Sequence, residues 1–355
     1  MKILHILTDT NIGGAGRYLM ALLASYNRSD FVMEVVLPEG SRLVPHIKAL
    51  DVTVLEVPYI GDRSLSIKGI KVLYRLLGER EPDIVNTHAS FSGRIAAKMK
   101  GIPAVYTRHY CVTKQRLNFL NNLLGDRVIA TSPEVEAGLL ATGTKAEFIT
   151  SIYNGVPPLN RLSQEKKINI RKRYGIDFDT FVISQVARLD PIKGQDYTLD
   201  AAKLLTNDRD IVILLCGDGP SENHLRRRIK EESIENVIMT GFIEDVEEIF
   251  NISDLQINAS FTETTCLALL EGMSLGIPAV ATNGGGNPYV IIHGERGLIV
   301  PCGDGAAIGD AIVTIKKDPG LYQQLSTKAL DGYNRHFRAD TMARQVEGLY
   351  KALRK

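Results

Sequence analysis

The sequence predicts an α/β protein with two Rossmann-like domains, each built on a parallel sheet covered by helices on both faces. Short runs rich in Val and Ile alternate with stretches of helical period along most of the chain. A length of 355 residues suits about two domains. The alternation breaks at the turn-rich segment NGVPP, residues 154–158, and then restarts. We therefore expect a first domain at 1–157, a second at 158–335, and a C-terminal helix at 336–355 that packs back on the first.

In the first domain, apolar β-branched runs predict strands, because such residues suit a sheet that is buried on both faces. Amphipathic stretches between them predict the crossover helices. The expected strands are 2–7, 33–37, 52–57, 83–87, 104–107 and 127–131, and the clearest helices are 15–26 and 65–80.

In the second domain, the same alternation restarts after a charged stretch at 164–175. The expected strands are 181–187, 211–216, 236–240, 254–258, 278–282 and 297–300, and the expected helices are 194–205, 221–232, 244–251 and 265–275. The last segments, 305–317, 319–334 and 338–353, have helical period without strands between them. Ligands of such sheets bind beyond the carboxyl ends of the strands, so we expect the site in the cleft between the two halves.

Composition excludes several protein classes. Hydrophobic residues make up 44% of the chain and 42 Lys+Arg balance 41 Asp+Glu, which excludes a disordered chain and predicts no nucleic-acid partner. Uncharged runs are too short to cross a bilayer, and the N-terminus lacks the pattern of a signal peptide. Four dispersed cysteines without a C-x-x-C pair argue against a zinc site or disulfide framework and indicate a cytoplasmic protein.

A glycine-rich loop follows the first expected strand and precedes a helix. Gly13 and Gly14 there would let the backbone approach a phosphate at a helix N-terminus. The dinucleotide pattern G-x-G-x-x-G is only half met, because Leu19 stands at the third glycine position. Glu34 is a candidate for the ribose-binding acid of that pattern. A tight strand-to-helix turn is the structural alternative.

Two loops of the second domain have residue types that suit a nucleotide diphosphate. Arg188 and Lys193 lie five residues apart after a strand, and two cations converging there suit a diphosphate. The small residues around Gly217 follow the next strand and leave room for a ligand. Solvated loop cations and an ordinary turn are the alternatives.

The segment NASFTETTCLALLEGMSLGIPAVAT, residues 258–282, is the most specific motif. Glu263 lies in a loop after a strand, and Glu271 lies within the following helix, where it could hold paired hydroxyls. Residues 264–267 begin that helix and offer backbone N–H groups to an anion. A solvated carboxylate would account for Glu271 alone, but not for the whole cluster.

Other candidates are histidines and carboxylate pairs. His88 and His109 each follow a strand of the first half, where a ligand role and a structural role are equally expected. The D-x-D pairs at 177–179 and 208–210 precede strands, so we interpret them as loop carboxylates and predict no metal.

Basic residues concentrate in 92–127, a segment that contains seven Lys or Arg residues and one acidic residue, Asp126. Such a patch suits an anionic acceptor or an anionic membrane surface. A solvated face is the alternative. The residues we expect on the rim of an acceptor site are His88, Lys98, Lys100, Lys114 and Arg116.

In this order, the motifs resemble those of the retaining glycosyltransferases of family 4, which have the GT-B fold. The resemblance covers nearly the whole chain. It includes the loop GGAGRY, the histidine after Thr107 and Arg108, the NGV link, the R-L-x-x-x-K-G loop and the two glutamates with GMSLGIPAVAT. The sequence departs from the family in having Thr-Thr-Cys after Glu263 where many members have Gly-Phe-Gly.

The resemblance implies an acceptor-binding first domain and a donor-binding second domain that face each other across a cleft. It implies that Arg188 and Lys193 bind the donor diphosphate, that Glu263 lies beside the transferred sugar, that Glu271 holds the ribose and that His109 points toward the sugar. The remaining donor-binding residues that it implies are Gly13, Gly14, Gly217, Gly241, Phe242, Ile243, Thr264, Thr265, Cys266 and Leu267.

The function that we expect is therefore metal-independent, retaining transfer of a hexosyl group from a nucleotide sugar to a hydroxyl of a glycan or lipid-linked acceptor. Such a reaction would serve cell-surface polysaccharide or glycolipid synthesis, with UDP favoured over GDP and no cofactor. We expect the enzyme in the cytoplasm, with weak peripheral binding to the membrane. A nucleotide-sugar epimerase, a nicotinamide-dependent dehydrogenase and a non-catalytic sugar-nucleotide-binding protein are the alternatives.

Overall fold

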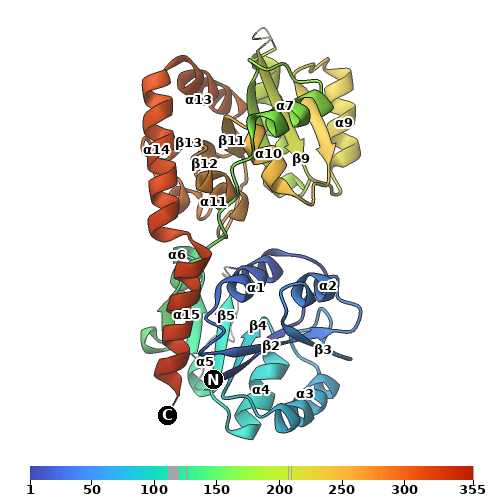
Figure 1. Cartoon of the computed structure of the whole chain (residues 1–355), viewed down its shortest axis with the longest axis vertical. Helices are drawn as coiled ribbons and strands as arrows, with labels where there is room; N and C mark the ends of the chain where they lie inside the picture. Colours follow the sequence, from blue (N-terminus) through green and yellow to red (C-terminus); the bar gives the residue numbers. More distant parts are fainter. Residues whose placement is uncertain (111–119, 125–126, 207, 209, 355) are drawn as a thin grey trace. The chain divides into compact units, whose positions relative to one another are not determined.

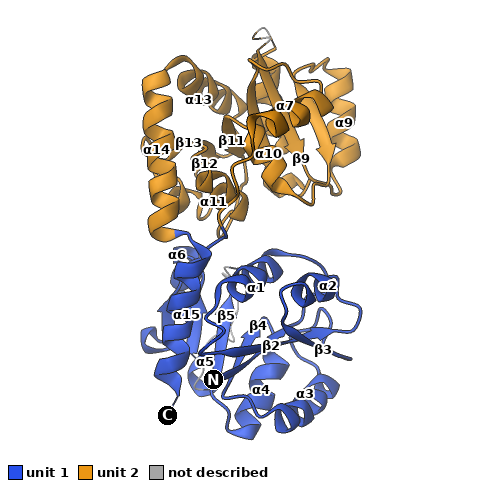
Figure 2. Cartoon of the chain, in the orientation of Figure 1, with its two compact units in different colours: residues 1–157, 337–355 blue, residues 158–336 orange. Residues whose placement is uncertain are grey.

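The computed structural model describes residues 1–110, 120–124, 127–206, 208 and 210–354. The chain divides into two compact units, with residues 1–157 and 337–355 in unit 1 and residues 158–336 in unit 2 (Figures 1 and 2). In both units every strand pairing is parallel. The α/β class with two parallel sheets is thus confirmed. No helix within the described part of the chain is long and apolar enough to cross a membrane.

Unit 1 contains a seven-stranded sheet of order β3-β2-β1-β4-β5-β6-β7. Serines 66, 90 and 132 cap α3, α4 and α6 by accepting a hydrogen bond from a first-turn amide. Its elements are β1 Lys2–Leu7, α1 Gly14–Ser25, β2 Val32–Pro38, α2 Leu43–Lys48, β3 Thr53–Val57, α3 Ile67–Arg80, β4 Ile84–His88, α4 Phe91–Lys100, β5 Ala104–Arg108, α5 Leu120–Leu124, β6 Arg127–Ala130, α6 Pro133–Ala141, β7 Ile149–Ser151 and α15 Ala339–Leu353.

The last helix of the chain belongs to unit 1. Helix α15 belongs to the same unit as α1 (Figure 2) and packs against it. Met342 and Val346 of α15 lie in the core that α1 and α15 share with the sheet. Val156 forms a β-bridge with Arg338, and Asn86 donates a hydrogen bond to the hydroxyl of Tyr350 (2.6 Å). The opposite face of the sheet is covered by α3 and α4 around Leu73, Ala96 and neighbouring residues.

Unit 2 contains a six-stranded sheet of order β10-β9-β8-β11-β12-β13. The charged stretch after the link forms α7, with most of its charged residues exposed and Ile170 buried. The elements are α7 Gln164–Arg173, β8 Phe181–Val186, α8 Gln195–Leu204, β9 Ile211–Cys216, α9 Glu222–Glu231, β10 Val237–Gly241, α10 Val246–Ile252, β11 Leu255–Asn258, α11 Leu267–Ser274, β12 Ala279–Thr282, α12 Asn287–Val290, β13 Gly297–Val300, α13 Gly305–Lys317 and α14 Pro319–His336.

Candidate functional site

Each sheet has one point where the strand order reverses, and the strongest motifs lie beside these points. In unit 2, β8 and β11 are neighbours, and the chain proceeds outward from them in opposite directions. In unit 1, β1 and β4 have the same relation. Because the loops after two such strands diverge, a crevice forms at the carboxyl edge between them, where ligands of open α/β sheets bind.

Lys193 and Glu263 meet at the reversal point of unit 2. Lys193 lies in the loop after β8 and Glu263 in the loop after β11, and Lys193 Nζ is 2.5 Å from Glu263 Oε1. The same carboxylate oxygen accepts a hydrogen bond from Ser260 Oγ (3.1 Å). Only 23% of the lysine side chain and 13% of the glutamate side chain are exposed, so this charged pair is largely shielded from water.

Three consecutive glycines after β12 hold the Glu263 loop, and our sequence analysis did not identify them. Gly285 has φ +54°, and a Cβ there would lie 2.2 Å from the carbonyl oxygen of Glu263. A Cβ on Gly284 would lie 2.4 Å from the carbonyl oxygen of Ser260. The Gly286 amide donates a hydrogen bond to the Glu263 carbonyl (2.8 Å). The run Asn-Gly-Gly-Gly at the end of a strand was the signal that would have located this support.

Arg188 lies in the same loop after β8 as Lys193 but is open to solvent. Its guanidinium forms an ion pair with Asp190, and 66% of its side chain is exposed. A Cβ on Gly217 would lie 2.0 Å from the Ala187 carbonyl oxygen, and one on Gly219 would lie 2.3 Å from that of Leu189. Both glycines have positive φ and therefore let the loop after β9 pair closely with the Arg188 segment. The structure thus gives Gly217 a backbone role in positioning Arg188.

The segment of Gly241, Phe242 and Ile243 continues the same edge. The Gly217 amide donates a hydrogen bond to the Gly241 carbonyl (2.8 Å), which joins the loops after β9 and β10. Phe242 is 63% exposed, and Ile243 packs partly against the core. Since β10, β9, β8 and β11 are successive strands, residues predicted from four separate motifs line one edge of one sheet.

Helix α11 begins just beyond Glu263. Thr264 and Thr265 precede it, Cys266 is its N-cap, Leu267 is its first residue and Glu271 is its fifth. The amides of a first helical turn lack acceptors within the helix, so this end is favourable for an anion. Burial raises the pKa of the Cys266 thiol to about 12, and the charge of Glu263 adds to this shift. The thiol therefore remains protonated at neutral pH and is not a nucleophile.

In unit 1 the predicted glycines divide into two roles. A Cβ on Gly14 would meet nothing within 4 Å, and one on Gly13 would meet only Asp9 at 3.8 Å. These two glycines therefore border open space. By contrast, a Cβ on Gly16 would lie 2.7 Å from Leu43, so this glycine permits α1 to pack against α2.

Glu34 has a structural role that removes it from nucleotide recognition. Its carboxylate forms ion pairs with Arg80 and Lys2, and only 6% of its side chain is exposed. Although burial opposes ionisation, hydrogen bonds from Arg80 and the charge of Lys2 hold the pKa of Glu34 below its usual value. The dehydrogenase interpretation therefore loses the acid that it required.

Three histidines form a hydrogen-bonded row at the carboxyl edge of unit 1. His5 Nδ1 lies 3.1 Å from His88 Nε2, and His88 Nδ1 lies 2.9 Å from His109 Nε2. The rings of His88 and His109 are stacked with centroids 5.2 Å apart, and Tyr18 lies edge-on to His109 at 4.9 Å. His88 and His109 were predicted from the sequence, but His5, in the middle of β1, was not.

Burial keeps this row uncharged. It lowers the pKa of His5 to about 3 and, together with the charge of Arg108, that of His109 to about 3. Burial and the two flanking rings also lower the pKa of His88 well below its ordinary value. Each neutral imidazole has one donor and one acceptor nitrogen, so the protons along the row all point in the same direction. His88 is therefore placed to fix the orientation and tautomer of His109.

The basic stretch does not form one patch. Arg94 and Arg108 are buried; Arg94 donates a hydrogen bond to Asn121, and both guanidinium groups lie over the Tyr106 ring. Lys98 and Lys100 are exposed in the last turn of α4, which returns to the amino edge of the sheet. The structure thus does not bring these lysines together with His88. Lys114 and Arg116 lie outside the described residues.

The carboxylates offered by the D-x-D pairs lie at the amino edge of the unit 2 sheet. Asp208 and Asp210 both form ion pairs with Lys316, at 3.2 and 2.9 Å. Within the described residues, no group of three or more His, Cys, Asp or Glu side chains is placed to hold a metal ion.

The comparisons with known families agree with this geometry. Residues 12–158 match the model of Glycosyltransferase Family 4, and residues 166–331 match that of Glycosyl transferases group 1. The chain is a family 4 glycosyltransferase. The resemblance drawn from the motifs is thereby confirmed, and so is the GT-B fold class.

Relatives of this glycosyltransferase include enzymes with different acceptors in their names. It is 31% identical to the N-acetyl-alpha-D-glucosaminyl L-malate synthase of Bacillus anthracis, over 57% of this chain and 53% of the relative. It is 26% identical to the UDP-Gal:alpha-D-GlcNAc-diphosphoundecaprenol alpha-1,3-galactosyltransferase of Escherichia coli, over 99% of this chain and 96% of the relative. The solved structure of Anabaena HepE in complex with UDP and glucose matches the fold with a TM-score of 0.87 and 23% identity, over 99% of this chain and 100% of HepE.

Proposed function

We propose that this glycosyltransferase moves a hexosyl group, with retention of configuration, from a nucleotide-diphosphate sugar to a hydroxyl of a glycan or lipid-linked acceptor. The product would serve cell-surface polysaccharide or glycolipid synthesis. The observation that carries the proposal is the Lys193–Glu263 pair at the reversal point of the unit 2 sheet, beside Arg188 and the N-terminus of α11.

Charge stabilisation is the main chemical demand of this reaction. The departing nucleotide diphosphate gains negative charge in the transition state, and preorganised cations and amides stabilise such charge. Lys193 and Arg188 each pair with a carboxylate, Glu263 and Asp190 respectively. A bound diphosphate would supply a second, stronger anion to both cations and to the first amides of α11.

The other residues would orient the two substrates. Glu263 would lie beside the transferred sugar, where Lys193 and Ser260 fix its carboxylate. Glu271 would bind the ribose hydroxyls, and Gly217 with residues 241–243 would border the base. In unit 1, His109 would hydrogen-bond the sugar, and Gly13 and Gly14 would leave room for the donor.

Retention would follow if the acceptor hydroxyl attacks from the face that the diphosphate leaves. The C–O bond to the diphosphate breaks as the bond to the acceptor oxygen forms, and the leaving phosphate oxygen accepts the hydroxyl proton. No covalent sugar–enzyme intermediate is required in this route.

UDP is the favoured nucleotide. The name of the E. coli relative specifies UDP-Gal as its donor and a lipid diphosphate acceptor, and the HepE structures contain UDP. The B. anthracis relative is named for L-malate, which makes a small hydroxy acid the second candidate acceptor.

We also propose that the reaction needs no metal, because Arg188, Lys193 and the start of α11 supply positive charge where the diphosphate would leave. Activity in excess EDTA should then equal activity with magnesium. Complete and reversible loss of activity on chelation would contradict this part of the proposal.

The decisive experiment is a donor and acceptor screen with the product read by NMR. Candidate donors are UDP- and GDP-hexoses, and candidate acceptors are a lipid-linked glycan and L-malate. We expect UDP release and a product whose anomeric coupling matches that of the donor. Isomerised sugar nucleotide without acceptor would indicate an epimerase, and UDP binding without any turnover would indicate a binding protein.

A further inference from the structure

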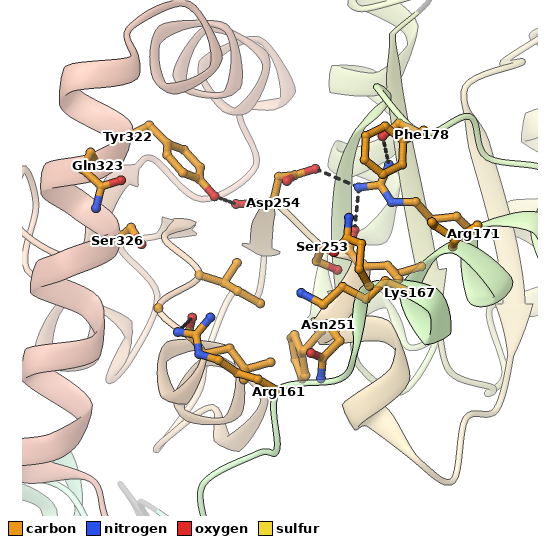
Figure 3. A pocket seen from close by; sticks show the side chains of 17 residues that line it. Arg161, Lys167, Arg171, Phe178, Asn251, Ser253, Asp254, Tyr322, Gln323 and Ser326 are labelled. Atoms are coloured by element: carbon orange, nitrogen blue, oxygen red, sulfur yellow. Dashed lines mark hydrogen bonds and ion pairs between the residues drawn. The ribbon is translucent and has the colours of Figure 1, made fainter.

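A cavity lies in unit 2, away from the loops described above. Its volume is about 490 Å³, and α7 and α14 form two of its walls (Figure 3). The other lining residues include Ser253 and Asp254, which precede β11, and Ile277, which precedes β12. Since all strands of this sheet are parallel, the cavity lies at the amino edge, opposite to Lys193 and Glu263. It therefore has no part in the proposed transfer site.

Positive charge exceeds negative charge in the cavity wall. Its charged side chains are those of Arg161, Lys167 and Arg171 against that of Asp254. Arg171 is anchored, because it donates to the carbonyls of Asp177, Phe178, Thr180 and Ile252 and contacts Asp254 at 3.4 Å. Arg161 donates one hydrogen bond, to the Leu275 carbonyl at 2.8 Å.

Lys167 is the unusual member of this group. Figure 3 shows its side chain extending from α7 into the space toward α14. Its ammonium group has no hydrogen bond or ion pair with any residue within the described ranges. Burial, followed by the charge of Arg161, lowers the pKa of Lys167 below its ordinary value. The charge of Asp254, in the same wall, offsets only part of this effect, so an anion in the cavity would stabilise the ammonium group further.

The opposite wall supplies neutral polar groups. Ser326 and Gln323 of α14 line the cavity, and the Tyr322 hydroxyl donates to the Asp254 carbonyl at 3.2 Å. The volume lies within the range of about 300–1,000 Å³ that is typical of small-molecule sites. A ligand with a dianionic group at the α7 side and hydroxyls toward α14 fits these walls.

We propose that this cavity binds a phosphate monoester, with the phosphate held by Lys167 and Arg161 and the remainder of the molecule facing α14. A phosphate monoester carries a charge of about −1.5 to −2 at pH 7, which matches the excess of cations. Free inorganic phosphate carries the same group that Lys167 and Arg161 would bind. Binding here would be independent of the donor nucleotide, because the two sites lie at opposite edges of the sheet.

The test is calorimetric titration of the full chain with glucose 6-phosphate and with inorganic phosphate, at constant ionic strength and with UDP at saturation. UDP occupies the proposed donor site and therefore keeps the added phosphate from binding at Lys193. We expect binding that weakens about tenfold or more in Lys167→Gln and in Arg161→Gln, because each loses a charge-assisted hydrogen bond. Lys166→Gln is the matched control, since Lys166 is exposed on the same helix and does not line the cavity.

Two sources of ligand are separated by the same titrations. Tighter binding of glucose 6-phosphate than of inorganic phosphate assigns a sugar phosphate, and equal affinity assigns phosphate itself. If Lys166→Gln and Lys167→Gln weaken phosphate binding equally, the effect comes from net charge alone, and the proposal is overturned. Absence of binding by the wild-type protein would also overturn it.

Discussion

The two sheets share the same reversal of strand order, yet they present opposite chemistry at their carboxyl edges. Unit 2 places charged pairs there, with Lys193 against Glu263 and Arg188 against Asp190. Unit 1 places neutral histidines there, with glycines that border open space and with the Asp9 carboxylate near Gly13. The difference arises from partners, because the histidines stay neutral beside one another and near Arg108, whereas each cation of unit 2 faces a carboxylate. We infer that unit 2 recognises the donor's charge and that unit 1 recognises neutral hydroxyls.

The largest expected effect concerns the cations of unit 2. Lys193→Ala and Arg188→Ala should each lower kcat/KM by about 100- to 1,000-fold, the usual loss when one charge-stabilising donor is removed. Lys203→Ala is the control, because Lys203 is exposed in the same unit and pairs with Glu232. Steady-state kinetics on folded variants measures the effect. Near-wild-type rates for both variants would remove the diphosphate assignment.

The two glutamates of unit 2 should separate binding from turnover. Glu271→Gln should weaken UDP binding by about tenfold, because a charge-assisted hydrogen bond to the ribose persists from the ground state to the transition state. Glu263→Gln should leave UDP affinity close to wild type and lower kcat. Calorimetry with UDP and initial rates would distinguish these outcomes. If the two variants exchange their effects, the roles of the two residues are reversed.

The neutral histidines of unit 1 should make it sensitive to acid. The pKa of His5 is about 3 in the folded protein, whereas an unfolded histidine titrates near 6.5. Below pH 6.5 the unfolded state therefore binds more protons, and the free energy of unfolding falls as pH falls toward 3. Between pH 7.5 and 5.0, His5 alone should lower the free energy of unfolding by about 2 kcal/mol.

Urea unfolding of the wild type and of His5→Gln at these two pH values checks this effect. The loss of stability on acidification should be smaller by about 2 kcal/mol in the variant. His336→Gln, at an exposed position in unit 2, is the matched control. An unchanged pH dependence in His5→Gln would mean that the histidine row is charged or open to water.

The smallest expected effect concerns the membrane. We propose that the enzyme binds weakly to its cytoplasmic face. Each Lys or Arg near an anionic bilayer contributes about 1 kcal/mol, and salt screens this contribution. Replacing Lys98, Lys100, Lys114 and Arg116 with Ser should therefore reduce co-sedimentation with anionic vesicles at low salt. Equal sedimentation with neutral and anionic vesicles would remove the membrane proposal.

Sequence patterns predicted the sheets well because buried parallel strands consist of continuous runs of β-branched and other apolar residues. They missed β7, which is a three-residue edge strand, and they assigned no helix to the charged stretch that forms α7. Motif position also predicted which residues would gather at the unit 2 edge, since the carboxyl ends of neighbouring parallel strands lie at the same edge of the sheet.

The remaining parts of the site depend on packing that no local pattern encodes. His5 lies mid-strand among apolar residues, and only the pairing of β1 with β4 brings it to His88. Arg94 and Arg108 looked like surface charges, but aromatic rings and an amide accommodate them in the interior. Lys98 and Lys100 follow His88 closely in sequence, yet the length of α4 carries them to the other edge of the sheet.

A crystal structure with bound UDP tests the contrast between the two units most directly. We predict that the diphosphate lies within hydrogen-bond distance of Arg188, Lys193 and the first amides of α11, with the ribose at Glu271. Lys193 would then share its ammonium group between the phosphate and Glu263. A diphosphate bound instead at Gly13 and Gly14 of unit 1, with the Lys193–Glu263 pair untouched, would contradict the account.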